Sequence, residues 1–303
     1  MGVNPWVSPY ELYHRKIGDV PAPDISDKPA VHWGTILENE VAREFTRRTG
    51  YRVARRGTLQ DMLVPYRIAN VDRIIPGECA GLECKTTSAY SADAWADGKI
   101  PLHYLYQCLH YMLVLFGDAA GDICADVAAR NPRWYIACLI GGQDYVYREI
   151  RYKDHIDDVR ALAAAESDFF RRVQEHDEPP VTGSSGDTKV LETLNDGTGD
   201  RVSDLDAADI ANLAHAIEGT NATITELKNR VALYKNQIIQ LLGNTTGIVT
   251  GRYRVTYTAG KPRESVDMKR LRNNGALYNN MKGSGLIKKT PGSKVLRIKY
   301  KGE

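Results

Sequence analysis

The chain has 303 residues, of which 43% are hydrophobic and 26% are charged, so it is long enough for about two globular domains and too apolar for a disordered protein. Its longest apolar run, residues 111–116, is far shorter than the about 18 residues that a transmembrane helix needs, which excludes a membrane-spanning protein. The net charge of +2 conceals an uneven distribution: residues 1–180 carry 21 basic and 26 acidic side chains, and residues 181–303 carry 19 and 12. The basic excess indicates either an anionic partner or a solvated basic surface.

The cysteines and the first residues of the chain bear on its compartment. Five cysteines lie between residues 79 and 138 without a Cys-x-x-Cys pair. Their odd number and their spacing favour reduced thiols over disulfide bonds or a structural zinc site. The first residues lack the basic segment and long apolar segment of a signal peptide. We therefore expect a cytoplasmic protein.

The first half of the chain begins with a helix and a hairpin. Large apolar residues recur every four positions between residues 30 and 49, which predicts an amphipathic helix that ends at Gly50. Residues 66–75 and 80–87 are typical of strands. The pair Pro76–Gly77 between them supplies a turn, so we expect an antiparallel hairpin.

The rest of this half repeats the alternation of helices and strands. Apolar residues at helical spacing predict a helix over residues 103–117. Two strand-like segments follow, at 134–142 and 144–152, and then an amphipathic helix over 154–176. This order predicts an α/β domain over residues 1–178, with a mixed central sheet flanked by helices.

The second half has a different pattern. A Pro pair and a Gly/Ser cluster predict a linker over residues 179–202. Residues 203–243 follow, with apolar residues at alternating spacings of three and four, which predicts a long helix or coiled coil. Gly219 and Thr220 leave open a kink or a two-helix hairpin. Residues 244–303 are expected to form a small basic β-α-β module, with its helix near 265–274 and a last strand near 295–300.

The sequence NVDRIIPGECAGLECKT (residues 70–86) carries the most informative chemistry. Residues two apart on a strand share a face, so Glu83 and Lys85 project together, and the hairpin brings Asp72 beside them. Two carboxylates can hold a divalent cation through hard oxygen ligands. A lysine next to such a cation can orient water or stabilise phosphate charge in phosphodiester hydrolysis. The alternative is a surface ion pair.

Two neighbouring helices carry further polar residues. Glu38 borders the apolar stripe of its helix, where a buried carboxylate needs a partner. Gln107 and Tyr111 are four positions apart and therefore share a helical face. Each of these residues alone is more often structural, and together with the strand motif they favour an active site.

Four segments in this order, WGTILENEVAREF (33–45), ANVD (69–72), GLECK (81–85) and YLYQCLHYMLV (104–114), resemble the YqaJ-type viral recombinase family. That family includes the phage lambda exonuclease and has the PD-(D/E)xK core of restriction-endonuclease-like nucleases. The resemblance covers residues 5–175 and implies the restriction-endonuclease-like α/β fold for this part of the chain.

The resemblance also implies roles for the motif residues. Asp72 and Glu83 would be metal ligands, with the backbone carbonyl of Cys84 as a third ligand, and Lys85 would be the catalytic lysine. Glu38 would help to bind a second metal ion or position water. Two further residues, Gln107 and Tyr111, would support the site, and Asp61 matches an acidic position of some relatives loosely. The cysteines do not repeat the spacing of iron-sulfur relatives, so no cluster is expected.

From the resemblance we expect a Mg²⁺-dependent exodeoxyribonuclease, with Mn²⁺ able to replace Mg²⁺. It would hydrolyse linear double-stranded DNA from its ends in the 5′-to-3′ direction and leave 3′ single strands for a phage annealing protein. The family also implies a ring, such as a trimer. The alternatives are an endonuclease or CRISPR-adaptation-type nuclease with the same core, and a non-catalytic DNA-binding accessory of recombination.

The basic tail suggests a second contact with DNA. Its basic residues alternate with tyrosines, a combination that can contact phosphates and stack on bases. A small basic module that packs on the nuclease or binds a protein is an equal alternative. The candidate DNA-binding residues are Arg252, Arg254, Lys261, Arg263, Lys269, Arg270, Lys288 and Lys289.

Overall fold

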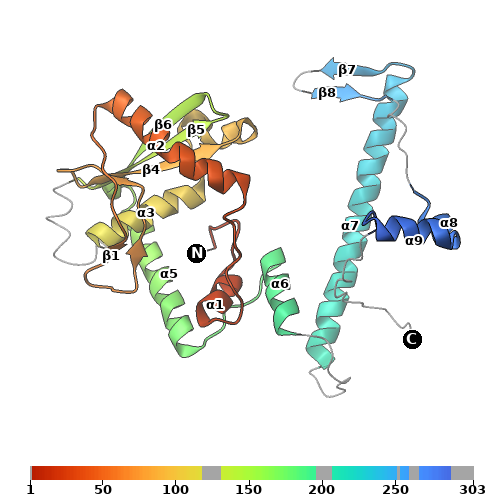
Figure 1. Ribbon diagram of the computed structural model, residues 1–303, viewed down its shortest axis with the longest axis horizontal. Helices are drawn as coiled ribbons and strands as arrows, with labels where there is room; N and C mark the ends of the chain where they lie inside the picture. Colours follow the sequence, from red (N-terminus) through yellow and green to blue (C-terminus); the bar gives the residue numbers. More distant parts are fainter. Residues whose placement is uncertain (1, 118–130, 196–206, 251–252, 259–265, 288–303) are drawn as a thin grey trace. The chain divides into compact units, whose positions relative to one another are not determined.

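The computed structural model describes residues 2–117, 131–195, 207–250, 253–258 and 266–287. They belong to two compact units that divide between Asp196 and Gly197. Figure 1 colours the first unit from red to green and the second from turquoise to blue. In the described ranges, no helix combines the length and the apolar character needed to cross a membrane.

A four-stranded sheet organises the first unit. Its strands β3 (Arg73–Ile74), β4 (Ala80–Thr87), β5 (Arg133–Ile140) and β6 (Asp144–Arg151) lie in this order. The β4 and β5 strands are parallel, whereas the two outer pairs are antiparallel. The sheet is therefore mixed, as predicted.

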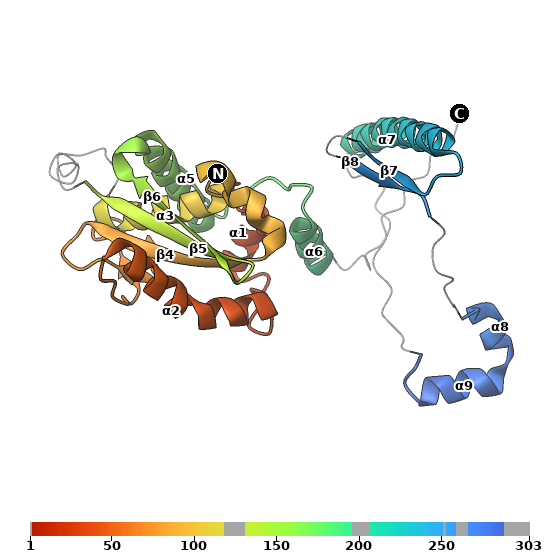
Figure 2. The same ribbon diagram turned by 90° about the horizontal axis from the view of Figure 1, so that it is seen from above.

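Helices cover both faces of this sheet. Figure 2 shows α2 (Pro29–Thr49) on one face and α3 (Leu102–Phe116) with α5 (Ile156–Glu175) on the other. The α2 helix has Pro at its first turn and ends where Gly50 adopts a left-handed φ of 77°, which a glycine tolerates. The predicted helices flanking a mixed sheet are confirmed.

The remaining elements of the first unit are short. They are α1 (Pro9–Ile17), α6 (Ser185–Leu194), the strand pair β1 (Leu59–Gln60) and β2 (Ile68–Ala69), and the 3₁₀ segments η1 (Ala89–Gly98) and η2 (Tyr152–Asp154).

Two apolar cores lie on opposite faces of the sheet. Trp134 is fully buried against Leu109 and Met112 of α3, whereas Phe45 of α2 packs with Leu82 on the other face. The backbone of β4 passes close to the indole of Trp134. A Cβ at Gly81 would lie 2.2 Å from this ring, so only glycine fits there. Strand β4 is thus held in place directly before its polar residues begin.

The predicted strand over residues 66–75 is wrong in part. The chain forms the two short strands β2 and β3 there, with a bend at Asp72 between them, and β3 pairs antiparallel with β4 as predicted. The side chain of Asp72 accepts the backbone N–H of Cys84 at 2.7 Å. A side-chain acceptor thus takes an N–H that could have bonded to the backbone of a neighbouring strand.

The predicted linker over residues 179–202 is also wrong in part, because residues 185–194 form α6. Asp187 of this helix is 1% exposed and accepts hydrogen bonds from the hydroxyl of Ser8 and from the N–H and hydroxyl of Thr182. Val190 is buried with Tyr10 of α1. These contacts attach α6 to α1 and extend the first unit beyond residue 178.

The second unit begins with the long helix α7 (Ala207–Leu242). It is unbroken at Gly219 and Thr220, where the Thr220 hydroxyl donates to the carbonyl of Ala216. The hairpin of β7 (Gly247–Thr250) and β8 (Tyr253–Thr256) follows, and then α8 (Met268–Asn273) and α9 (Gly275–Gly283). The predicted last strand near 295–300 lies outside the described residues.

Candidate active site

The β3–β4 hairpin brings together the acid, acid and lysine of the sequence motif. In β4, Leu82 enters the core under α2, so its neighbour Glu83 points to the α3 side, and Lys85 does the same. The Nζ of Lys85 donates to Oε1 of Glu83 at 2.5 Å. Asp72, held by the N–H of Cys84, lies beside this pair and interacts electrostatically with both residues.

Helix α3 holds Glu83 from the other side. The amide of Gln107 donates to Oε1 of Glu83 at 2.9 Å and to the hydroxyl of Tyr111 at 2.5 Å. Tyr111 itself is 5% exposed and lies against Trp134. The predicted pair of residues on one face of α3 thus fixes the orientation of the Glu83 carboxylate.

Lys85 remains a cation in this setting. Burial alone would lower the pKa of its ammonium, but the charge of Glu83 and their hydrogen bond outweigh burial and raise the pKa. Its Nζ also lies 4.7 Å from the ring centroid of Tyr104, a cation–π contact. Sequence reasoning missed Tyr104, although its position three residues before Gln107 places it on the same side of α3.

The structure does not group Glu38 with the two other carboxylates as a third free ligand. Arg73, which is 4% exposed, donates to Oε1 of Glu38 at 2.5 Å, to the carbonyl of Asp72 and to the side chain of Asn39. Across the described residues, no three His, Cys, Asp or Glu side chains form a group ready to hold a metal ion. Sequence reasoning also missed Arg73, because an arginine beside a candidate catalytic acid has no distinctive spacing.

Glu83, which is buried, and Asp72, which is half-buried, nevertheless form an incompletely compensated pair of carboxylates. Glu83 is 2% exposed, and its Oε2 has no hydrogen-bond donor among the described residues. Burial raises the pKa of Glu83 to about 7, Lys85 opposes this, and repulsion by Asp72 adds to it. Burial also raises the pKa of Asp72, against the effect of the Cys84 N–H.

This donor set fits a hard divalent cation. Asp72 and Glu83 both have raised pKa values although they share one nearby cation, Lys85, and one oxygen of Glu83 has no hydrogen-bond partner among the described residues. Mg²⁺ is bound in proteins through one or two carboxylates together with water and phosphate oxygens. The two carboxylates therefore match the ligands that such an ion requires.

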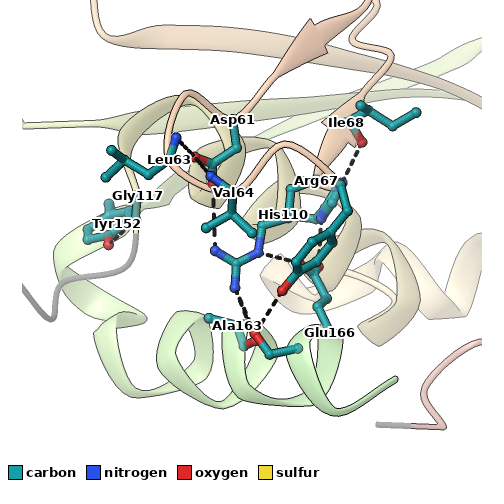
Figure 3. Close-up of polar contacts among 12 residues, drawn as sticks. Asp61, Leu63, Val64, Arg67, Ile68, His110, Gly117, Tyr152, Ala163 and Glu166 are labelled. Carbon is teal, nitrogen blue, oxygen red and sulfur yellow. Dashed lines mark hydrogen bonds and ion pairs between the residues drawn. The ribbon is translucent and has the colours of Figure 1, made fainter. Parts of the chain in front are cut away.

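Asp61 belongs to a different cluster. It accepts the N–H groups of Leu63 and Val64, which closes the turn between β1 and β2. Its other oxygen lies 3.6 Å from the guanidinium of Arg67, which contacts Glu166 of α5 (Figure 3). Asp61, the acidic residue that matches some relatives loosely, is thus paired with Arg67 and lies apart from Asp72 and Glu83.

The second unit contains the candidate DNA-binding residues. Arg254 on β8 and Lys269 and Arg270 on α8 are exposed. Five further candidates lie outside the described residues: Arg252, Lys261, Arg263, Lys288 and Lys289.

Comparisons with known proteins give relatives along most of the chain. Residues 1–121 match the family model of the YqaJ-like viral recombinase domain. The uncharacterized protein YqaJ of Bacillus subtilis (strain 168) is 33% identical over 277 residues, which cover 90% of this chain and 81% of that protein.

Solved structures also resemble the chain in part. The alkaline exonuclease LHK-Exo of Laribacter hongkongensis overlaps with a TM-score of 0.41 and 14% identity, over 55% of this chain and 80% of the exonuclease. Its complex with dAMP overlaps with the same TM-score and 16% identity, over the same shares.

Proposed function

Because the chain belongs to the family of the YqaJ-like viral recombinase domain, we propose that it is a deoxyribonuclease of DNA recombination that degrades linear double-stranded DNA from its ends. The family resemblance predicted from the sequence motifs is confirmed. The observation that carries the proposed activity is the site on β4, where Asp72, Glu83 and Lys85 meet and Oε2 of Glu83 has no partner among the described residues.

The cofactor that this site supports is Mg²⁺, with Mn²⁺ as a substitute. Asp72 and Glu83 would hold the ion, with the backbone carbonyl of Cys84 as a further ligand. When bound, the ion lowers the pKa of water and neutralises negative charge on the phosphate. Gln107 keeps Glu83 in the orientation that presents its free oxygen.

Lys85 is the catalytic cation of the proposal. Its raised pKa keeps the ammonium charged at neutral pH, and Glu83 and Tyr104 fix its position. A fixed positive charge stabilises the charge that develops on the phosphate oxygens, and it costs no reorganisation during the reaction.

Glu38 is proposed as a ligand of a second metal ion or as a residue that positions water. Its hydrogen bond with Arg73 holds it on the side of the hairpin where Asp72 lies, and its charge raises the pKa of Asp72. In the metal-binding role, the carboxylate of Glu38 would release its hydrogen bond with Arg73 and bind the ion instead.

The finer parts of the proposal rest on the family resemblance. They are a 5′-to-3′ direction, a 3′ single strand as product, delivery of this strand to a phage annealing protein, a ring-shaped oligomer such as a trimer, and action in the cytoplasm. The basic residues of the second unit would contact DNA phosphates.

The test compares linear duplex DNA with covalently closed circular DNA in Mg²⁺. We expect the full-length protein to degrade linear duplex DNA and to leave covalently closed circles intact, and removal of Mg²⁺ with a chelator should abolish activity. Digestion of the closed circle would contradict the exonuclease and favour an endonuclease of the same core. End-labelled duplex, followed over time, measures the direction.

Lys85→Ala tests the site itself. Loss of a positioned charge in a buried site should lower the rate by about 100-fold or more. Lys99→Ala is the matched control, because Lys99 is exposed in the same unit. Wild-type activity in Lys85→Ala would refute the site, and absence of activity in the wild-type protein under all conditions would favour the non-catalytic accessory.

A further inference from the structure

Helix α7 carries an exposed apolar stripe along its whole length. We call this set the α7 stripe, and its members are Ile210, Leu213, Ile217, Thr220, Ile224, Leu227, Val231, Tyr234, Ile238 and Leu241. Its nine apolar members are each 41–87% exposed. Within the described ranges, only Leu242 of α7 is buried. Contiguous apolar surface of this kind marks an interaction site.

The spacing and the residue types of the α7 stripe are those of a coiled coil. Spacings of three and four alternate without interruption over five heptads, so the stripe follows a repeat of 3.5 residues. All five first (a) positions hold Ile or Val, and three of the five fourth (d) positions hold Leu. Branched residues at a, combined with Leu at d, favour two parallel strands.

We propose that α7 pairs with α7 of a second copy of this chain in a parallel, in-register, two-stranded coiled coil. Such a dimer would bury the α7 stripe of each copy against an identical stripe. The a, d, e and g positions of five heptads amount to twenty residues on each side. This number agrees with the about 20–30 residues per partner of a stable interface.

The charges that flank the α7 stripe are compatible with this pairing. In a parallel coil each g residue faces the e residue five positions later on the partner helix. Asp209 then faces Ala214, Thr223 faces Lys228 and Gln237 faces Leu242. None of these pairs brings two like charges together. Only the guanidinium of Arg230 meets a like charge, on Lys235.

This single like-charge pair is weakened within each helix. Arg230 donates to Glu226 of its own helix at 2.9 Å, and Arg230 is exposed. Exposed like charges cost only a few tenths of a kcal/mol. The pair also provides a test: Lys235→Glu would convert it into an attractive pair, and only in the parallel arrangement.

Cysteine cross-linking measures the arrangement directly. All native cysteines lie between residues 79 and 138, in the first unit. In the full-length protein, Thr220→Cys places a thiol at a d position, where two in-register helices bring identical residues together. Ala222→Cys places a thiol on the outer face as a matched control. Mild oxidation should yield a disulfide-linked dimer about tenfold more abundantly in Thr220→Cys than in the control or the wild type.

Analytical ultracentrifugation of full-length variants gives a second readout. Ile224→Asp together with Leu227→Asp should weaken self-association about 100-fold or more, since every 1.4 kcal/mol is a factor of ten. Ala222→Asp adds a charge to the outer face and should leave association unchanged, and circular dichroism checks that helix content is preserved. Lys235→Glu should strengthen association.

Three results would overturn the proposal. They are equal cross-linking of the two cysteine variants, association that is insensitive to the double Asp variant, and no effect of Lys235→Glu. Binding of the α7 stripe to another protein or to a different segment of this chain would produce the first two results. None of the measurements uses nuclease activity, and the cross-linking reports on α7 alone, so the cross-linking result is independent of the proposed function and of its ring-shaped oligomer.

Discussion

Two clusters of buried and half-buried charged side chains lie in the first unit, and they differ in how their charge is compensated. In one, Arg67 and His110 are paired with Asp61 and Glu166 (Figure 3). Nε of Arg67 and Oε2 of Glu166 make no hydrogen bond in this cluster, but they form an ion pair at 3.2 Å. In the candidate active-site cluster, Lys85 alone faces two carboxylates, and Oε2 of Glu83 has neither a hydrogen-bond donor nor an ion-pair partner among the described residues.

The contrast separates a cluster suited to holding segments together from one suited to binding a ligand. A buried charge group whose partners are all present holds segments together, and its loss costs stability. A group that lacks a partner destabilises the fold until a ligand supplies the missing charge, and perturbed pKa values gather at such sites. The first cluster joins the β1–β2 turn to α3 and α5, whereas the second is suited to a cation and a phosphate.

The largest expected effect comes from Glu83→Gln. We expect the nuclease rate to fall about 1,000-fold, because the free carboxylate oxygen is lost. The melting temperature at pH 8 should be unchanged or higher, because the amide avoids the cost of burying a carboxylate whose pKa burial raises to about 7. That cost is absent below about pH 4.5 and complete above about pH 7, since the folded protein retains the proton between these values.

Glu166→Gln is the matched change in the compensated cluster. It should lower the melting temperature, because Arg67 and His110 lose their shared partner, and leave the rate per folded molecule unchanged. Differential scanning fluorimetry and a nuclease assay measure both quantities. If Glu83→Gln were the more destabilising of the two variants at pH 8, the contrast between the clusters would fail.

The next effect is on stability alone. Arg67 is 5% exposed, contacts Asp61 and Glu166, and donates to the carbonyl of Ala163. Arg67→Met would leave two carboxylates without their arginine, so we expect a loss of about 3–5 kcal/mol in the free energy of unfolding. Urea unfolding measures this loss.

Arg43→Met serves as the control for this change. The side chain of Arg43 is 75% exposed and pairs with Glu40 on the surface of α2, and such pairs are worth about 0–1 kcal/mol. A loss below 1 kcal/mol for Arg67→Met would show that the compensated cluster does not hold the unit together.

Most of the fold follows from periodicity, because burial on one face repeats every two or about four residues. This holds for the amphipathic helices α2, α3 and α5, whereas β5 is buried at seven of its eight residues and follows from its apolar composition. Periodicity fails where a side chain replaces the backbone as hydrogen-bond partner. Asp72 lies in a bend and accepts the N–H of Cys84, and Asp187 accepts the N–H of Thr182 at the buried start of a helix in a Gly/Ser-rich segment.

The site shows the same division. Strand geometry alone places Glu83 and Lys85 on one face of β4, whereas Asp72 reaches them from a bend outside β3, where it accepts the N–H of Cys84. The partners that control their charge were not evident, since Arg73 and Tyr104 meet the site only through the tertiary packing of the hairpin and α3. The sequence likewise contained no signal that Asp61 would be paired with Arg67.

The smallest effect is a pH dependence in the compensated cluster. Burial and the charge of Arg67 lower the pKa of His110, but the hydrogen bond and charge of Glu166 and the carbonyl of Ile68 outweigh them and raise it. A folded-state pKa above the unfolded value means that protonated His110 stabilises the fold at low pH. This contribution is complete below about pH 6.5 and is lost as the pH rises through the folded-state pKa.

We expect the stability difference between the wild type and His110→Gln to be largest near pH 6 and to shrink towards pH 9, in urea unfolding at each pH. A difference that grows with pH would mean that His110 is neutral in the folded protein, and Arg67 would then compensate the two carboxylates alone.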